Sequence, residues 1–188
     1  LLPETIQLSA VAEPHLPLVL ADPGQLDQIM VNLVVNARDA IDGPGRIEVN
    51  AFTTTVEPGT VLSHDGVVPG GTYVVLAVED DGAGIPPALR SRLFEPFFTT
   101  KVQGKGTGLG LATCYGIAKQ ASGYVRVESQ VDRGTRFEFW FPAVEGAVEA
   151  AVSSEIEPVP DLPPMVVWVA EDDRAVRELL CATLRDLG

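Results

Sequence analysis

Apolar and polar residues recur with two different periods along the chain, and each change of period marks an element that we predict. Alternate residues are apolar over Thr5–Val11, which predicts a strand with Ile6 and Leu8 on one face. From Pro23 the period becomes three and four residues, which predicts a helix with Asp22 as its N-cap. The apolar residues that recur along this helix are Leu26, Ile29, Met30, Leu33, Ala37, Ala40 and Ile41.

The middle of the chain predicts two long strands, followed by a region with little regular structure. The strands cover Arg46–Val56 and Thr72–Asp80, and the loop between them contains His64. Residues 81–110 hold six glycines and three prolines around one short amphipathic segment, Pro87–Phe94. This composition predicts loops that surround at most one short helix.

A second helix and a hairpin follow the glycine-rich region. The helix is predicted over Leu109–Ala121, and the hairpin joins Tyr124–Ser129 to Thr135–Phe141. The resulting order of elements, β, α, β, β, loop, α, β, β, is typical of an α/β two-layer sandwich. We therefore expect a mixed sheet with helices on one face.

The acidic residues divide the chain into three predicted parts. Residues 1–143 carry 16 acidic and 10 basic side chains and contain all of the elements above, so we assign them to one domain. Residues 144–164 carry five acidic side chains, no basic ones and a proline cluster, which is typical of an extended linker. Residues 165–188 are too few to form a domain of their own. The net charge of −13 argues against a nucleic-acid partner, because a polyanion is bound by clustered Lys and Arg.

Two further features bear on the compartment. No apolar run reaches the roughly 18 residues that span a bilayer, and Leu1–Glu4 lacks the basic character of a signal peptide. The two cysteines, Cys114 and Cys181, fall in unrelated helical patterns, so we expect reduced thiols rather than a disulfide. The sequence thus predicts a soluble, cytoplasmic segment without membrane contact.

Two asparagines on the first predicted helix are candidates for chemistry. Asn32 and Asn36 are four residues apart, so both lie on one face of the helix, beside its apolar residues. Each could simply bond a neighbouring backbone group. Alternatively, a carboxamide oxygen could ligate Mg²⁺ that is held between phosphate groups.

The strand that ends at Asp80 runs directly into a turn with the sequence DDGAGIP. An acid at the end of a strand can accept a hydrogen bond from an exocyclic amine. Gly82 and Gly84 would let the backbone approach a flat ring closely. A turn rich in Asp and Gly is also ordinary after a strand, so both interpretations stay open here.

Alternating glycines precede the second predicted helix, in the sequence GKGTGLGL at Gly104–Leu111. Backbone N–H groups at a helix N-terminus form a site for an anion such as a triphosphate. The run lacks the Gly-Lys-Ser/Thr of a Walker A loop and does not follow a strand, as a Rossmann fingerprint would. A flexible lid or tether is the alternative.

Three of the seven phenylalanines lie together in Leu93–Lys101, beside two of the loops described above. They could fill the core. They could also form a hydrophobic latch that controls a lid.

Taken in order, four stretches resemble the catalytic and ATP-binding domain of sensor histidine kinases, in the Bergerat-fold group that also contains gyrase. The stretches are NLVVNARDA, DDGAGIP, LFEPFFTTK and GKGTGLGLA. The resemblance covers residues 1–143 and implies ATP and Mg²⁺ as ligands. Four motifs in the family order are far more specific than any one of them.

The resemblance also implies roles for individual residues. Asp80 would read the adenine amino group, Asn36 would coordinate Mg²⁺, and Asn32 and Lys105 would act with it at the phosphates. The ATP-binding residues that the resemblance implies are Asn32, Asn36, Asp80, Gly82, Gly84, Ile85, Phe94, Lys101, Gly104, Lys105, Gly106, Thr107, Gly108, Leu109, Gly110, Leu111 and Thr135.

The chain departs from the family pattern at several positions. Asn32 stands where gyrase-like members carry a glutamate that activates water, which favours phosphoryl transfer over hydrolysis because an amide is no general base. Asp39 stands where many members place a lysine, and Asp132 where a glycine is usual. A gyrase-like ATPase and a non-catalytic, nucleotide-binding regulatory module remain the alternatives.

Neither histidine of the chain, His15 or His64, stands in the sequence context of the family's phosphoacceptor. The resemblance therefore implies a partner, the phosphoacceptor histidine helix of a dimerisation domain outside this chain, through which the parent protein would form a homodimer. A receiver domain or response regulator would be the next partner.

The last residues resemble the start of such a receiver domain. An apolar strand-like run from Met165 ends at Glu171 and Asp172, which would bind Mg²⁺ in that context, and an amphipathic segment follows. This implies a hybrid kinase. For the acids themselves, a role as a charged helix cap stays open.

Overall fold

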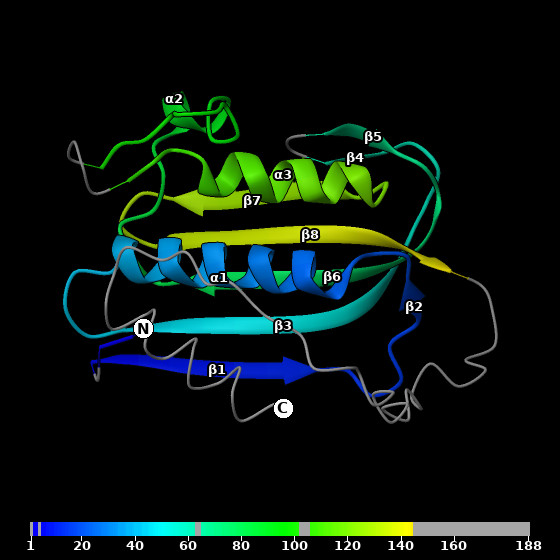
Figure 1. Cartoon of the computed structure of the whole chain (residues 1–188), viewed down its shortest axis with the longest axis horizontal. Coiled ribbons are helices and arrows are strands. Elements are labelled where there is room, and N and C mark those ends of the chain that lie inside the picture. Colours follow the sequence, from blue (N-terminus) through cyan, green and yellow to red (C-terminus); the bar gives the residue numbers. More distant parts are fainter. Residues whose placement is uncertain (1, 4, 63–64, 102–105, 145–188) are drawn as a thin grey trace, which may run out of the picture. The chain divides into compact units, whose positions relative to one another are not determined.

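The computed structural model describes residues 2–3, 5–62, 65–101 and 106–144, and these form one α/β unit (Figure 1). In chain order its elements are β1 (Ile6–Ala12), β2 (Leu18–Val19), α1 (Pro23–Ala40), β3 (Gly45–Val56), β4 (Thr60–Leu62), β5 (Gly66–Val68), β6 (Gly71–Asp80), α2 (Pro87–Arg90), α3 (Gly110–Gln120), β7 (Tyr124–Gln130) and β8 (Gly134–Val144). Among the helices in these ranges, none is long and apolar enough to cross a bilayer.

The main sheet is mixed, as the order of elements predicts. Its strands follow the order β1-β3-β6-β8-β2. The remaining strand, β7, stands outside this order and also pairs with β8. β1 runs parallel to β3, whereas β3, β6, β8 and β7 are joined by antiparallel pairing. In the register between β6 and β8, Asp80 stands opposite Thr135. The α/β two-layer sandwich is thus confirmed.

The helices α1 and α3 cover one face of this sheet (Figure 1). The N-cap of α1 is Asp22, whose carboxylate accepts the backbone N–H of Gln25 at 2.9 Å. The buried residues of α1 are Ile29, Leu33 and Ala37, and those of α3 are Cys114, Ile117 and Ala118. They join the inward residues of the strands in one hydrophobic core, which fixes both helices over the sheet.

The hairpin of β4 and β5 lies in the region that the sequence predicted as a loop. Its residues Leu62 and Val68 pack with Tyr73, Val75 and Trp140 in a second, smaller hydrophobic cluster. The strands are only three residues long, which is too short for a clear alternation of apolar and polar positions. β2, with two residues, escaped prediction for the same reason.

Two other expectations differ from the structure in detail. Leu8 is exposed although Ile6, on the same face of β1, is buried. β1 is the edge strand beside β3, and all of its residues after Ile6 are exposed. The amphipathic segment 87–94 is helical only over α2, which ends at Arg90. His64, Gly104, Lys105, the predicted linker up to residue 164 and the receiver-like segment with Glu171 and Asp172 lie outside the described residues.

Candidate functional site

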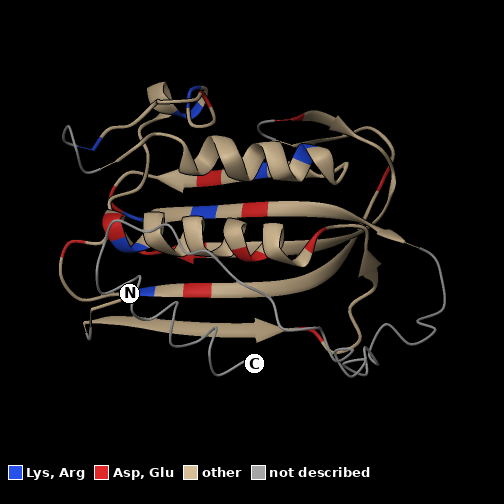
Figure 2. Cartoon of the chain, in the orientation of Figure 1, with Lys and Arg blue, Asp and Glu red and all other residues tan. Residues whose placement is uncertain are grey.

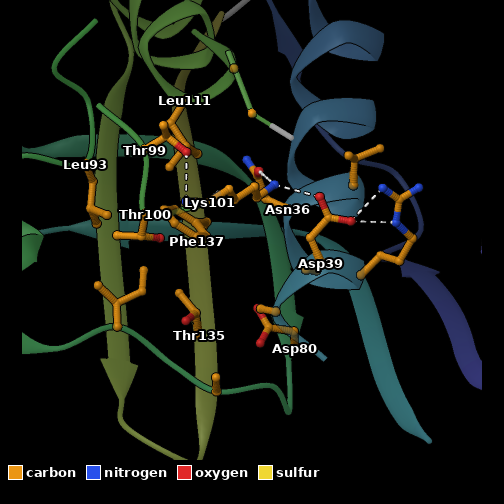
Figure 3. Close-up of a pocket in the computed structure, with 18 of the residues that line it drawn as sticks. Asn36, Asp39, Asp80, Leu93, Thr99, Thr100, Lys101, Leu111, Thr135 and Phe137 are labelled. Atoms are coloured by element: carbon orange, nitrogen blue, oxygen red, sulfur yellow. Dashed lines mark hydrogen bonds and ion pairs between the residues drawn. The ribbon is translucent and has the colours of Figure 1, made fainter. Parts of the chain in front are cut away.

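A cavity of about 810 Å³ lies between α1, the loop after β6, residues 98–101 and the beginning of α3. Its polar groups gather at two ends (Figure 3). We call the end formed by Asp80, Thr135 and the loop 82–85 the Asp80 end. We call the end formed by Asn36, Asp39 and Lys101 the Lys101 end.

The Asp80 end contains a buried carboxylate. Asp80 is only 6% exposed, and its side chain accepts the backbone N–H groups of Gly82, at 2.9 Å, and of Thr135. Burial raises the pKa of Asp80 to about 6, although these two N–H donors oppose the shift, and the nearby Asp81 and Glu79 add to it. The carboxylate is therefore an anion at neutral pH and can accept further hydrogen bonds from the cavity.

Glycines around the Asp80 end allow backbone segments to pass unusually close to one another. A Cβ atom on Gly84, which has a φ of +65°, would lie 2.0 Å from the carbonyl oxygen of Gln130. A Cβ on Gly134 would lie 1.8 Å from the carbonyl oxygen of Asp80, and one on Gly82 would lie 2.5 Å from that of Ala40. These glycines are thus required by the packing of the chain on itself, a reason other than the close approach to a ring that the sequence suggested.

The Lys101 end is more exposed and carries both signs of charge. The ammonium of Lys101 lies 2.6 Å from the carboxylate of Asp39 and donates to Oδ1 of Asn36 at 3.2 Å (Figure 3). Arg38 also pairs with Asp39, at 2.6 Å. Figure 2 shows an acidic and a basic residue side by side at the C-terminal end of α1. Burial opposes the charge of Asp39, but the hydrogen bonds from Lys101 and Arg38 outweigh it and lower the pKa of Asp39.

Asn32 lies one turn before Asn36 on α1, and α3 begins directly against it. A Cβ on Gly110 would stand 3.3 Å from Oδ1 of Asn32 and 4.0 Å from the amide nitrogen of Asn36. The first turn of α3 therefore closes over both amides. Cys114 lies one turn further along α3, where it is fully buried against α1 beside the backbone oxygen of Ile29.

Apolar residues also line the cavity, among them Ile85, Leu93, Leu111 and Phe137. The three clustered phenylalanines have separate environments. Phe94 is buried behind the cavity wall, 5.1 Å from the ring of Tyr115, and so fills the core. Phe98 lines the cavity, and Phe97 is 74% exposed with a φ of +67°.

Most of the residues that the sequence singled out meet in this cavity. Those that line it are Asn32, Asn36, Asp80, Gly84, Ile85, Lys101, Gly106, Thr107, Gly108, Gly110, Leu111 and Thr135. Gly82, Phe94 and Leu109 are not among the lining residues, so their part in a site stays a prediction.

Other lining residues were not predicted, including Leu89, Leu93, Thr99 and Phe137. A weak signal exists for some of them. Phe137 lies two residues after Thr135 on the same strand and therefore on the same face, and Leu93 follows Leu89 at helical spacing.

The sequence was compared with known families and proteins. Residues 21–145 match the family described as "Histidine kinase-, DNA gyrase B-, and HSP90-like ATPase". The chain belongs to this family. The curated proteins to which the chain is similar include sensor kinases. Sensor kinase CckA of Brucella abortus is 42% identical over 166 residues, which are 85% of this chain and 18% of CckA.

Two further sensor histidine kinases are similar to this chain. Sensor histidine kinase ZraS of Escherichia coli K12 is 37% identical over 73% of this chain and 26% of its own length. Sensory histidine kinase/phosphatase NtrB of Rhizobium meliloti is 39% identical over 75% and 36%. The chain thus spans about a third or less of each of these three relatives.

Solved structures of histidine kinases share the fold of this chain. The mycobacterial sensor histidine kinase MprB superimposes with a TM-score of 0.57 at 26% identity, over 74% of this chain and 83% of that one. Full-length ShkA, solved in complex with AMPPNP, gives 0.57 at 30% identity, over 76% of this chain and 26% of ShkA. The catalytic domain of histidine kinase ThkA gives 0.55 at 30% identity, over 74% and 80%.

Proposed function

We propose that this chain is the nucleotide-binding catalytic part of a cytoplasmic, two-component sensor histidine kinase, and that its cavity binds Mg·ATP. The observation that carries the proposal is the buried carboxylate of Asp80 at one end of a cavity that also contains Asn36 and Lys101. The described residues supply no basic partner for this anion, and an unpaired buried anion costs free energy, so a binding function best accounts for it.

The Asp80 end suits an adenine base. The carboxylate can accept a hydrogen bond from an exocyclic amine, and the apolar lining residues Ile85 and Phe137 suit the faces of a ring. The triphosphate would then extend toward the Lys101 end, where the first turn of α3 and Gly108 lie. Lys101 is the described cation that lies closest to Asn36 there.

The residues at the Lys101 end also fit a magnesium ion that arrives with the nucleotide. Oδ1 of Asn36 is a hard, neutral oxygen that already attracts a cation, the ammonium of Lys101, at 3.2 Å. Mg²⁺ commonly takes only one or two protein oxygens and completes its shell with phosphates and water. When bound, it would neutralise charge that develops on the phosphate oxygens.

The proposed reaction transfers the γ-phosphoryl group to a histidine. An imidazole nitrogen attacks the phosphorus in line, and the bond to the β–γ bridging oxygen breaks with its electron pair left on ADP. By the resemblance to gyrase-like proteins, Asn32 stands where they carry a glutamate general base. An amide cannot remove a proton from water, so transfer to an imidazole is favoured over hydrolysis. The chain's contribution is the position of the phosphates and the neutralisation of their charge.

The acceptor histidine is proposed to lie on a helix of a dimerisation domain outside this chain. His15 is exposed in the turn after β1 and has a φ of +62°, so it is no part of the cavity. We further propose residues 1–143 as the catalytic domain, 144–164 as a linker and 165–188 as the start of a receiver domain. A receiver or response regulator would then accept the phosphoryl group from the histidine.

Calorimetry of the full chain with Mg·ATP tests the nucleotide part of the proposal. We expect binding in the micromolar to millimolar range that is lost in Asp80→Asn. If the chain binds no adenine nucleotide, the proposal is wrong.

Radiolabelled Mg·ATP and a supplied phosphoacceptor domain test the transfer. We expect a phosphohistidine on the acceptor that forms only when the chain is present. Steady release of phosphate without an acceptor would instead identify an ATPase, and binding without either reaction would identify a regulatory module.

A further inference from the structure

Ser129, near the end of β7, holds three polar groups at the Asp80 end although it does not line the cavity itself. Its hydroxyl oxygen lies 2.7 Å from the backbone nitrogen of Ile85 and 3.0 Å from the carbonyl oxygen of Gly134. It also lies 2.9 Å from the hydroxyl oxygen of Thr135. Two of these partners, Ile85 and Thr135, line the cavity.

The hydrogens in this cluster can be assigned by counting. A serine hydroxyl has one proton to donate and two lone pairs that accept. The carbonyl oxygen of Gly134 can only accept, so the proton of Ser129 is donated to it. The N–H of Ile85 can only donate, so it occupies one lone pair. The contact with Thr135 must therefore be a bond that Thr135 donates and Ser129 accepts.

This assignment fixes what Thr135 offers to the cavity. Because its only hydroxyl proton is donated to Ser129, its oxygen presents lone pairs alone. The carboxylate of Asp80, directly opposite in the sheet, is also an acceptor. Two backbone donors nearby are already engaged, since Gly82 donates to Asp80 and Ala83 donates to the carbonyl oxygen of Ala40 at 2.9 Å.

We propose that Ser129 is a positioning residue for base specificity: by taking the proton of Thr135, it makes both side chains at the Asp80 end hydrogen-bond acceptors. Such a surface favours a purine with an amino group at position 6 and disfavours one with a carbonyl oxygen there. The inference rests on the proposed function, because it concerns the base of the same nucleotide. It adds a residue that never touches the ligand.

Removal of the Ser129 hydroxyl has a specific consequence. In Ser129→Ala, the proton of Thr135 loses its acceptor and can turn toward the cavity. It can then donate to a carbonyl oxygen on the base. Since a site built for one hydrogen-bond pattern rejects the opposite pattern strongly, we expect the wild type to prefer ATP over inosine triphosphate by about 100-fold or more. In Ser129→Ala this preference falls by about tenfold, mainly through tighter binding of inosine triphosphate.

The test is calorimetric titration of the full chain with Mg·ATP and with Mg·inosine triphosphate. Inosine triphosphate carries a carbonyl oxygen in place of the amino group and a protonated ring nitrogen beside it. The variants are Ser129→Ala, Ser129→Thr, which keeps a hydroxyl, and Thr135→Val, which removes the hydroxyl that Ser129 directs. Ser9→Ala, on the exposed side of β1, is the matched control.

The expected result is a reduced preference for ATP in Ser129→Ala and Thr135→Val, and the wild-type preference in Ser129→Thr and Ser9→Ala. An unchanged ratio of the two affinities in a folded Ser129→Ala chain overturns the inference. If that variant fails to fold, Thr135→Val decides in the same way, since a ratio equal to that of the wild type contradicts the role of the directed hydroxyl.

The two proposals fail in different ways. A wild-type chain that binds ATP and inosine triphosphate equally well contradicts the inference about Ser129 but leaves the proposed function intact. A wild-type chain that binds neither nucleotide overturns both.

Discussion

The two ends of the cavity are built on different physical terms. At the Asp80 end, a buried carboxylate is held by backbone N–H groups, and the segments around it touch at glycines that leave no room for a side chain. At the Lys101 end, the contacts are ion pairs between partly exposed side chains, with Lys101 32% and Asp39 25% exposed. Exposed ion pairs contribute little to stability, whereas the close backbone contacts at these glycines cannot accommodate a side chain without a large loss of stability.

This difference suggests that the Asp80 end selects the base and the Lys101 end binds the phosphates. Groups that must distinguish one base from another gain from a fixed pattern of donors and acceptors, which the packed backbone provides. Groups that hold phosphates need charge, and a loosely held ion pair can exchange partners at little cost. We therefore expect changes at the Asp80 end to alter folding and binding together, and changes at the Lys101 end to alter binding alone.

The largest effect is expected for Gly134→Ala. The new Cβ would lie 1.8 Å from the carbonyl oxygen of Asp80, and the residue has a φ of +97°, so β6 and β8 would have to separate. We expect a loss of about 3 kcal/mol or more in the free energy of unfolding, measured by urea denaturation. Gly116→Ala in α3 is the control, because no atom lies within 4 Å of its Cβ, and it should be neutral or stabilising. Equal stability of the two variants would contradict the packing described here.

Asp80→Asn should change both binding and stability, in opposite directions. We expect ATP affinity to fall by about 100-fold, since the amide places a donor where the base also donates. Because the pKa of Asp80 is raised to about 6 in the folded chain, its charge costs stability, and this cost grows as the pH rises from the unfolded value of 3.8 through 6. At pH 8 the variant should therefore be more stable by about 1 kcal/mol, part of the gain being offset by a lost hydrogen bond. A variant that is less stable than the wild type at pH 8 would refute this reasoning.

The wild-type chain should show the same titration as a pH dependence of binding. Below pH 6 Asp80 becomes protonated and can no longer accept from an amine with both oxygens. ATP affinity should then fall by up to about tenfold for each pH unit, because one proton is taken up for each ligand released. Calorimetry between pH 5 and 8 measures this, with constant affinity across the range as the contrary outcome.

Substitutions at the Lys101 end should have smaller effects on ATP affinity. The effects should be opposite in sign for the two members of the ion pair, Lys101 and Asp39. Lys101→Gln should weaken ATP binding by about tenfold, whereas Asp39→Asn should strengthen it by about threefold, because it removes a negative charge and frees Lys101. Both differences should shrink in 0.5 M salt, and neither variant should change the free energy of unfolding by more than about 1 kcal/mol. A large loss of stability in Asp39→Asn would show that this end, too, supports the fold.

The smallest effect is expected at the turn between β7 and β8. Asp132 has a φ of +60°, a conformation that costs an aspartate little but a glycine nothing. Its backbone N–H donates to the carbonyl oxygen of Ala83 and so joins the turn to the Asp80 end. Asp132→Gly should change the free energy of unfolding by less than about 1 kcal/mol, measured by thermal denaturation, without any change in ATP affinity.

The long elements and the meeting of the motifs could be predicted from the sequence. The helix from Pro23 and the long strands β3 and β6 have enough residues to show their period, and Asp22 is an N-cap with an evident chemical reason. The short strands β4 and β5 could not be predicted, because three residues carry no period. The need for glycine at positions 134 and 84 could not be predicted either, because it depends on contacts between segments about 50 residues apart.

The Lys101 end shows a second limit of sequence reasoning. Asp39 could be identified as a departure from the family pattern, but its pairing with Lys101, 62 residues away, follows only from the fold. Ser129 gave no signal at all. Its importance comes from the number of its partners and not from its residue type.

The buried thiol of Cys114 makes the packing of α3 against α1 accessible to a simple kinetic experiment. The side chain is fully buried between α1 and α3, and burial raises its pKa to about 11, so at neutral pH it is both protonated and shielded. A thiol reagent can reach it only when the two helices separate. In a Cys181→Ser chain, the rate at which Cys114 is labelled would therefore measure how often α1 and α3 separate. The same rate with nucleotide present would measure how far a bound nucleotide slows this separation.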